Sequence, residues 1–260
     1  MDAIRQNDFL SLKKIILILL FLFLIPMKNI FADAPYITDD PAVMDPWNWD
    51  VILYATVDKY KSFTALQAPA LELDFAFIPN SEIDIYLPYQ NNINARPAYR
   101  SGIPNSSGVG DTDVEIKYRL LKESKYLPLI SLVPNIYFPT GDINQGLGNG
   151  HIWYTLPLSI EKTFGTWTTY AELGYGLNSQ YFAVNYLFGG FVVEKTLNDK
   201  ITVGGEVYSQ GKSSIFLSSS TLLNFGVTYK LDKHATLLFS LGRGIIGQEQ
   251  WASYLGISWG

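Results

Sequence analysis

The sequence has 260 residues, a formal net charge of −5 and no cysteine, and aromatic residues make up 15% of it. The lack of cysteine excludes disulfides, thiolate metal sites and cysteine nucleophiles, and the acidic balance argues against nucleic acid as a partner. Charged residues make up 17% of the chain, below the roughly 25% typical of soluble domains, as expected when part of the surface faces lipid.

Residues 1–32 have the layout of a secretory signal peptide. Lys13 and Lys14 precede an unbroken apolar run over 15–25, and we expect cleavage after Ala32. The alternative is a membrane anchor, but the run is shorter than the 20 or so residues that a spanning helix needs. The chain after Ala32 carries 15 bases and 22 acids, a net charge of −7.

Residues 33–46 form an acidic segment ahead of the first predicted strand. We expect a solvated periplasmic segment. One alternative is that it folds into the lumen of a barrel as a partial plug. Another is that Asp39, Asp40 and Asp45 bind calcium through their carboxylates.

From residue 47 onwards, polar and apolar residues alternate with a period of two, which is typical of β-strands. In the clearest segment, Val114, Ile116 and Tyr118 share one face and charged residues occupy the other. If the polar face is enclosed, the following charged residues line a lumen: Glu72, Asp74, Glu82, Asp84, Asp113, Glu115, Lys117, Arg119, Glu172, Glu206 and Lys230. Residues 127–138 and 183–193 are apolar on both faces, so the period does not settle which way they face.

About twelve strands are expected between 47–57, the first, and 251–259, the last, and single-chain bacterial outer-membrane barrels have even strand numbers. The links between strands alternate in length. Short links are expected near 79–81, 122–126, 164–165, 197–200 and 232–234, and long polar links near 58–67, 91–110, 139–150, 178–182, 209–220 and 244–249. Short turns belong on the periplasmic side of such barrels, so both termini are expected in the periplasm.

The predicted fold is all-β: a transmembrane antiparallel up-and-down barrel over 47–260. Aromatic residues near predicted strand ends are expected to form interfacial girdles: Trp47, Trp49, Tyr86, Tyr89, Tyr118, Trp153, Tyr154, Trp167, Trp251 and Trp259. The alternative is a soluble exported sandwich or lipocalin-like barrel. That fold predicts mixed link lengths and an apolar interior, whereas here the charged face is expected to be the enclosed one.

Three motifs carry a family resemblance. They are Ile-Thr-Asp-Asp at 37–40, Gly-Val-Gly-Asp-Thr-Asp at 108–113 running into Lys-Tyr-Arg at 117–119, and Pro-Thr-Gly-Asp at 139–142. With their order and spacing, they resemble the outer-membrane barrel family associated with the meta-pathway of phenol degradation, over nearly the whole mature chain. The resemblance implies a Gram-negative outer-membrane transporter of small, often aromatic, molecules. Members usually end on an aromatic residue used in assembly by the barrel-insertion machinery, whereas here Gly260 follows Trp259.

The motifs also have a structural interpretation. Gly108 and Gly110 allow the backbone angles needed where a long loop enters a strand, and Asp111 can accept hydrogen bonds from neighbouring amides. Pro139 stops a strand, because proline cannot donate to a sheet ladder.

An outer-membrane hydrolase would need a histidine beside a serine or an acid, and only His151 and His234 are available. His234 falls in a short turn. His151 falls at the outer rim without a serine close in sequence, although Ser213 or Ser218 could approach it in space. We therefore expect no catalytic site, cofactor site or metal site, and keep the hydrolase as the weaker alternative.

The function that these features favour is a passive channel. About twelve strands enclose a narrow lumen, and an excess of acids on its wall favours cations or neutral molecules over small anions. The expected partners are outer-membrane lipid, a small solute that is aromatic or otherwise hydrophobic, and the insertion machinery. The alternative is a structural or adhesive barrel, sealed by pairs of acids and bases, that works through its loops.

Overall fold

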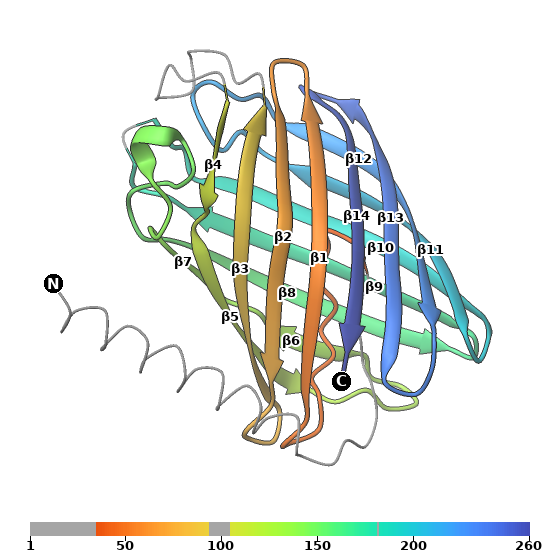
Figure 1. Ribbon diagram of the computed structural model, residues 1–260. Coiled ribbons are helices and arrows are strands. Elements are labelled where there is room, and N and C mark those ends of the chain that lie inside the picture. The colour runs from red at the N-terminus through yellow and green to blue at the C-terminus, as the bar shows by residue number, and fades with distance from the viewer. Residues whose placement is uncertain (1–34, 94–104, 181) are drawn as a thin grey trace, which may run out of the picture.

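The chain folds into strands that run side by side around a closed wall (Figure 1). The computed structural model describes residues 35–93, 105–180 and 182–260, so the predicted leader and its cleavage site lie outside the described residues. The elements are β1 (Trp49–Tyr60), β2 (Thr64–Phe75), β3 (Ser81–Ile93), β4 (Ser106–Val109), β5 (Thr112–Leu121), β6 (Leu129–Leu132), β7 (Asn135–Phe138), the 3-10 helix η1 (Ile143–Gln145), β8 (Trp153–Phe164), β9 (Trp167–Leu177), β10 (Tyr186–Asn198), β11 (Ile201–Gln210), β12 (Ser220–Lys230), β13 (Ala235–Ile246) and β14 (Glu249–Trp259).

The first and last strands close the wall. β1 pairs with β14 in antiparallel register from Val51↔Trp259 to Tyr60↔Glu249. β4 and β5 both pair with β3, and β6 and β7 both pair with β5 and β8. β4 and β5 therefore occupy one strand position in the wall, and β6 and β7 occupy another; we call each strand position a stave. The fold is therefore a closed antiparallel barrel of twelve staves, which confirms the predicted fold class and strand number.

The pattern of burial is the reverse of that in a soluble β-sandwich. On β8, Leu156, Leu158 and Ile160 are 42–48% exposed, whereas Thr155 and Ser159, on the other phase, are buried. Because neighbouring side chains of a strand point to opposite faces, the apolar phase covers the outside of the barrel and the polar phase faces its interior. This arrangement excludes the soluble alternative and is typical of an outer-membrane barrel.

Burial also shows which residues face the interior in the two segments 127–138 and 183–193, for which the sequence pattern did not. In the stave formed by β6 and β7, Ser131 and Asn135 are buried and Leu132 is exposed. In β10, Val192 is buried and Phe191 is exposed. Apolar residues thus occupy part of the inner face as well as the outer one, which is why periodicity alone could not orient them.

Two of the predicted long links are wrong. The link between β1 and β2 comprises only residues 61–63, and that between β13 and β14 comprises only 247–248. Most of the residues assigned to loops at 58–67 and 244–249 belong to strands instead. Asp58 continues the inward phase of β1, whereas Glu249 faces inward through a bulge in the β1–β14 pairing that puts it out of phase with the rest of β14. The links at 139–152, 178–185 and 211–219 and all five short links overlap their predicted positions. The link predicted at 91–110 includes the end of β3 and all of β4, and residues 94–104 lie outside the described residues.

The aromatic girdles are correct in part. Seven of the ten predicted residues are exposed on the surface, but Trp49 is buried, and Tyr86 and Trp153 line interior cavities. Nearness to a strand end does not fix which phase an aromatic residue occupies.

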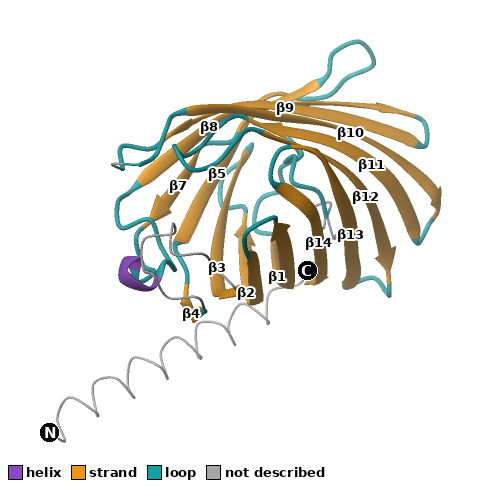
Figure 2. Cartoon of the chain, turned by 90° about the horizontal axis from the view of Figure 1, so that it is seen from above, coloured by secondary structure: helices purple, strands orange, loops and turns teal. Residues whose placement is uncertain are grey.

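The two ends of the barrel differ. We call the end that holds the turns at 165–166 and 199–200 the short-turn end; β1 begins and β14 ends there (Figure 1). The opposite end, with the links at 139–152, 178–185 and 211–219, is the long-loop end. Seen from above, the strands enclose an interior into which other segments of the chain run (Figure 2). In the described part of the chain, no helix has the length and apolar character needed to cross a membrane.

Candidate functional site

The charged residues predicted to face the lumen occupy two environments. Eight are buried inside the wall: Glu72, Asp74, Glu82, Asp84, Glu115, Lys117, Glu172 and Glu206. Asp113 is half-buried and accepts a hydrogen bond from Asn135 at 3.2 Å. The other two lie at the short-turn rim, where Arg119 donates to Asn80 at 2.8 Å and Lys230 is exposed at the end of β12. The buried set therefore contains seven acids and a single base.

Residues 36–44 lie inside the barrel and bridge its two sides. The backbone N–H and the hydroxyl of Thr38 both donate to Glu206 on β11, each at 2.6 Å. On β3, the Met44 N–H donates to Glu82 at 2.6 Å. β3 and β11 are six staves apart in a wall of twelve, so the segment reaches from one side of the lumen to the other.

A pair of inward-facing glycines leaves space for this segment. Gly204 on β11 and Gly226 on β12 are register partners. A Cβ at Gly204 would lie 2.5 Å from the Tyr36 hydroxyl, and one at Gly226 would lie 2.6 Å from the Tyr36 ring. The Tyr36 ring also meets Tyr170 edge to face, with centroids 6.5 Å apart. The bare backbone of the two glycines therefore forms the surface on which Tyr36 packs.

Lys117 on β5 is the only buried base in the described part of the chain. Its Nζ lies 3.6 Å from Asp39 of the N-terminal segment, 3.9 Å from Glu82 and 4.0 Å from Glu115. An ammonium group with no exposed side-chain area must be compensated by nearby acids. Lys117 thus ties the N-terminal segment to the wall and compensates part of the acidic charge there.

The loop at 139–152 is fastened over the long-loop end by the family motifs. Asp111 accepts hydrogen bonds from the Gly141 N–H at 3.0 Å and the Asn149 N–H at 2.6 Å, and the Thr140 hydroxyl donates to the Gly110 carbonyl at 2.8 Å. Leu147, at the centre of the loop, is only 3% exposed and lines an interior cavity. The structural interpretation is therefore confirmed for Asp111, which accepts the amide hydrogen bonds, and for Pro139, which follows the end of β7. It is wrong for the backbone angles of Gly108 and Gly110, neither of which has a positive φ; a Cβ at Gly108 would instead lie 2.8 Å from Leu147 of the loop.

Three cavities occupy the remaining interior, with volumes of about 430, 680 and 360 Å³. Aromatic side chains line all three cavities. Tyr137 and Trp153 stack with centroids 3.6 Å apart, and Tyr54 and Tyr254 stack at 5.2 Å. Tyr86 and Tyr186 line both larger cavities, while Glu72, Glu115 and Glu172 line the cavity of about 430 Å³. The interior thus offers aromatic faces beside carboxylates.

The sequence interpretation missed two of the acids in this interior. Asp58 and Glu249 line the cavity of about 360 Å³ but fall in segments predicted to be loops. The signal was present for Asp58, since Tyr54, Thr56 and Asp58 continue the inward phase of β1. Continuing that alternation to the end of β1 identifies Asp58. It does not identify Glu249, which has the parity of the outward-facing Trp251 and faces inward through a bulge in the β1–β14 pairing.

The residues considered for catalysis and metal binding are not assembled into a site. His151 is exposed, and no hydrogen bond joins it to Ser213 or Ser218; the ring of His234 lies 3.3 Å from the Gly260 carbonyl in the short turn. Across residues 35–93, 105–180 and 182–260, no group of three or more histidines and acids is placed to hold a metal ion. Asp39, Asp40 and Asp45 therefore do not form the cluster of carboxylates that the calcium alternative needs.

Comparisons with known proteins agree with this architecture. Residues 32–259 match the family model described as "Putative MetA-pathway of phenol degradation". Among solved structures, an outer-membrane channel from Pseudomonas putida F1 has a TM-score of 0.63 at 14% identity, covering 81% of this chain and 94% of that one. The KdgM porin has a TM-score of 0.56 at 10% identity, over 81% and 98% of the two chains. The NanC porin has a TM-score of 0.53 at 10% identity, over 81% and 99%. A search of curated proteins finds no match. At these identities the structural likeness establishes the fold, which is that of outer-membrane barrel channels.

Proposed function

The chain belongs to the family described as "Putative MetA-pathway of phenol degradation", and from this premise we propose that it is a passive channel of the Gram-negative outer membrane for small solutes. The observation that carries the proposal is the interior: cavities lined by aromatic rings and carboxylates lie above a segment of the chain that crosses the lumen. The chain carries out no chemical step and needs no cofactor in this role.

The wall sets the charge of the solute. The buried acids Glu72, Glu115 and Glu172 border one continuous space, and Asp113 borders the next. A low-dielectric tube focuses the field of such charges, so small anions are disfavoured and cations or neutral molecules are admitted. The stacked rings of Tyr137 and Trp153 add flat apolar surface that suits an aromatic or otherwise hydrophobic body.

The segment 36–44 acts as a partial plug in this proposal. It narrows the half of the lumen nearer the short-turn end, here called the lower half, through its contacts with Glu206, Glu82 and Lys117. It leaves unfilled the cavities in the upper half, which is nearer the long-loop end. We assign residues 1–32 to a cleaved signal peptide and residues 47–260 to the transmembrane barrel.

The short-turn end faces the periplasm in this proposal, so both termini are periplasmic. Single-chain outer-membrane barrels have short periplasmic turns and longer outer loops, and three described links of eight or more residues lie at the long-loop end. The apolar outer phase contacts outer-membrane lipid, and assembly depends on the barrel-insertion machinery.

Conductance of refolded mature protein in a planar bilayer tests the proposal. We expect small, cation-selective steps, with the sign read from the reversal potential in a salt gradient. Selectivity for anions would contradict the assigned wall.

A closed structural or adhesive barrel is the second candidate. The Lys117 cluster favours it, because there a base on β5 joins acids of β3 and β5 to Asp39 of the segment that crosses the lumen. That candidate predicts no conductance at any salt concentration, even after residues 35–45 are removed.

A further inference from the structure

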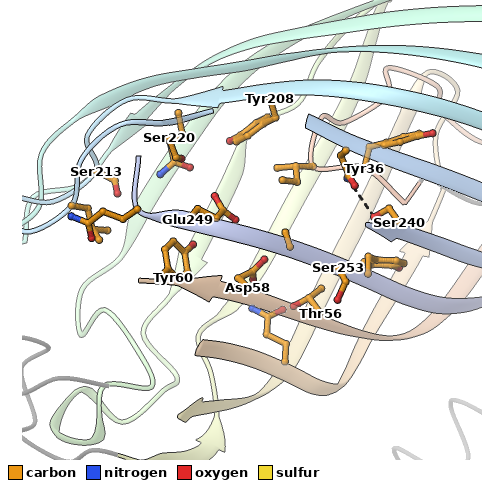
Figure 3. A pocket seen from close by; sticks show the side chains of 18 of the residues that line it. Tyr36, Thr56, Asp58, Tyr60, Tyr208, Ser213, Ser220, Ser240, Glu249 and Ser253 are labelled. Carbon is orange, nitrogen blue, oxygen red and sulfur yellow. Dashed lines mark hydrogen bonds between the residues drawn. The ribbon is translucent and has the colours of Figure 1, made fainter. Parts of the chain in front are cut away.

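The cavity of about 360 Å³ lies among β1, β11 and β14, between the end of the N-terminal segment and the loop at 211–219 (Figure 3). Asp58 comes from β1 and Glu249 is the first residue of β14. Glu249 pairs in register with Tyr60, two residues after Asp58. The two acids are therefore diagonal neighbours on one face of the sheet, and Figure 3 shows them beside the same space.

These two carboxylates have no partner in the described part of the chain. Neither accepts a hydrogen bond or forms an ion pair there, whereas Glu206 is bound by Thr38 and Glu82 by Met44 and Lys117. Lys59, next to Asp58, lies on the opposite phase and donates to Thr64 at 3.2 Å. The lining includes no lysine, arginine or histidine. The cavity thus holds two carboxyl groups with no basic side chain beside them.

A third acceptor points to the same conclusion. Asn224 is only 8% exposed and lines this cavity. Its amide nitrogen donates to Glu206 at 3.1 Å and to Ser240 at 3.4 Å, while its Oδ1 has no hydrogen-bond partner among the described residues. Buried acceptors are seldom left unpaired, so a ligand that donates hydrogen bonds would complete the site.

The rest of the lining favours an organic cation over a metal ion. Tyr36, Tyr60, Tyr208 and Tyr254 contribute rings, and ring faces attract ammonium groups. A hard metal ion needs six or more oxygen ligands close around it, and no cluster of three acids or histidines is placed to supply them in the described chain. The cavity has room for a small apolar body next to the charged group.

We infer that this cavity binds the protonated amine of a small aromatic or alkyl amine, with Asp58 and Glu249 accepting hydrogen bonds from the ammonium group and the tyrosine rings packing against its body. The inference rests on the proposed channel function, to which it adds the chemical class of the solute. The site lies above the plug, where a solute arriving from the long-loop end would first be held.

The probe is phenethylammonium, added to the long-loop side of wild-type channels in a bilayer, with 2-phenylethanol as the neutral analogue. We expect a concentration-dependent decrease in current with the amine and none with the alcohol. D58N/E249Q should raise the half-blocking concentration by about tenfold, which corresponds to about 1.4 kcal/mol. E161Q removes an acid on the inward phase of β8 near the short-turn end and should leave the half-blocking concentration unchanged.

Binding is measured separately by calorimetry on detergent-refolded protein, so that the inference does not depend on conduction. Heat-modifiable gel mobility checks that each variant folds. Equal affinity of wild type and D58N/E249Q for the amine would overturn the inference, as would equal block by potassium or by the alcohol. Silent channels that still bind the amine through Asp58 and Glu249 would overturn the channel function and keep the site. Channels that conduct but do not bind the amine would overturn the site and keep the channel function.

Discussion

The two halves of the lumen are built by the same strands, but they differ in how their charges are compensated. In the lower half, Glu206, Glu82 and Lys117 are bound by the N-terminal segment, which packs on bare glycine backbone. In the upper half, Asp58 and Glu249 face a cavity and have no partner among the described residues. Alternation gives both halves a polar wall. The comparison shows that the same kind of polar wall is closed where the N-terminal segment occupies the lumen and is available for binding where no segment fills it.

Removing the plug should have the largest effect on conductance, because the lower half of the lumen would then be as unobstructed as the upper half. Deletion of residues 35–45 leaves a lumen bounded only by the wall, and a twelve-stranded barrel lies between the filled eight-stranded and the open sixteen-stranded cases, so we expect conductance to rise by roughly an order of magnitude. Single-channel recording measures it. Replacing the same residues with glycine and serine at equal length is the control for chain length. An unchanged conductance in both variants would mean that the segment does not limit flow.

Removing the base of the lower half should cost the most stability. K117M leaves Asp39, Glu82 and Glu115 close together without a cation, and loss of one partner of a buried ionic group costs about 3–5 kcal/mol. Urea unfolding of the barrel in lipid vesicles measures the free energy of unfolding. K117R keeps the charge and should recover most of the loss. If K117M were as stable as wild type, the acids would be protonated or hydrated there, and the lower half would resemble the upper one.

A methyl group on the glycine surface should displace the plug while leaving the wall intact. A Cβ at Gly226 would lie 2.6 Å from the Tyr36 ring, and overpacking of this kind costs about 1–3 kcal/mol. We therefore expect G226A to raise conductance by less than the deletion does. G205A is the matched control, because its Cβ would have the Asn224 carbonyl as nearest neighbour, at 3.7 Å. Equal conductance of G226A and G205A would show that Tyr36 does not rest on this surface.

An exposed ion pair at the rim should have the smallest effect and sharpens the contrast with Lys117. Glu123 lies 2.8 Å from Lys162. Slight burial tends to raise the pKa of Glu123, but hydrogen bonds from Lys162 and the Thr163 N–H, together with the lysine charge, outweigh it and lower that pKa. A lowered folded-state pKa stabilises the protein above the unfolded value, and this contribution is lost as pH falls through the folded value.

E123Q should accordingly differ from wild type by at most about 1 kcal/mol at neutral pH. The difference should begin to decrease as pH falls to the ordinary glutamate pKa of about 4.3 and should vanish only below the lower folded-state pKa. Unfolding in urea across this pH range measures it. A difference that grows on acidification would reverse the assigned sign.

The sequence was sufficient for much of the candidate site as well as for the barrel. Glu72, Glu115 and Glu172 were identified as inward residues because phase along a strand is a local property. It was insufficient for Glu249, which has the parity of the outward-facing Trp251 and faces inward only through a bulge in the β1–β14 pairing. It also could not choose between a solvated and a lumenal course for residues 36–44, since that depends on Glu206 and Glu82, which lie far away in the chain.

The amino-acid sequence by itself determined the barrel, the number of its staves and the polarity of its two faces, because a period of two fixes which side chains share a face. Only the tertiary structure decided which acids are compensated, which glycines Tyr36 packs against, and that Asn224 and the two unpaired carboxylates line one cavity. The physical reason is the sequence separation of the groups involved. The face on which a side chain lies is set by the few residues around it, whereas compensation of a buried charge requires groups that are far apart in the chain and are brought together when the barrel closes.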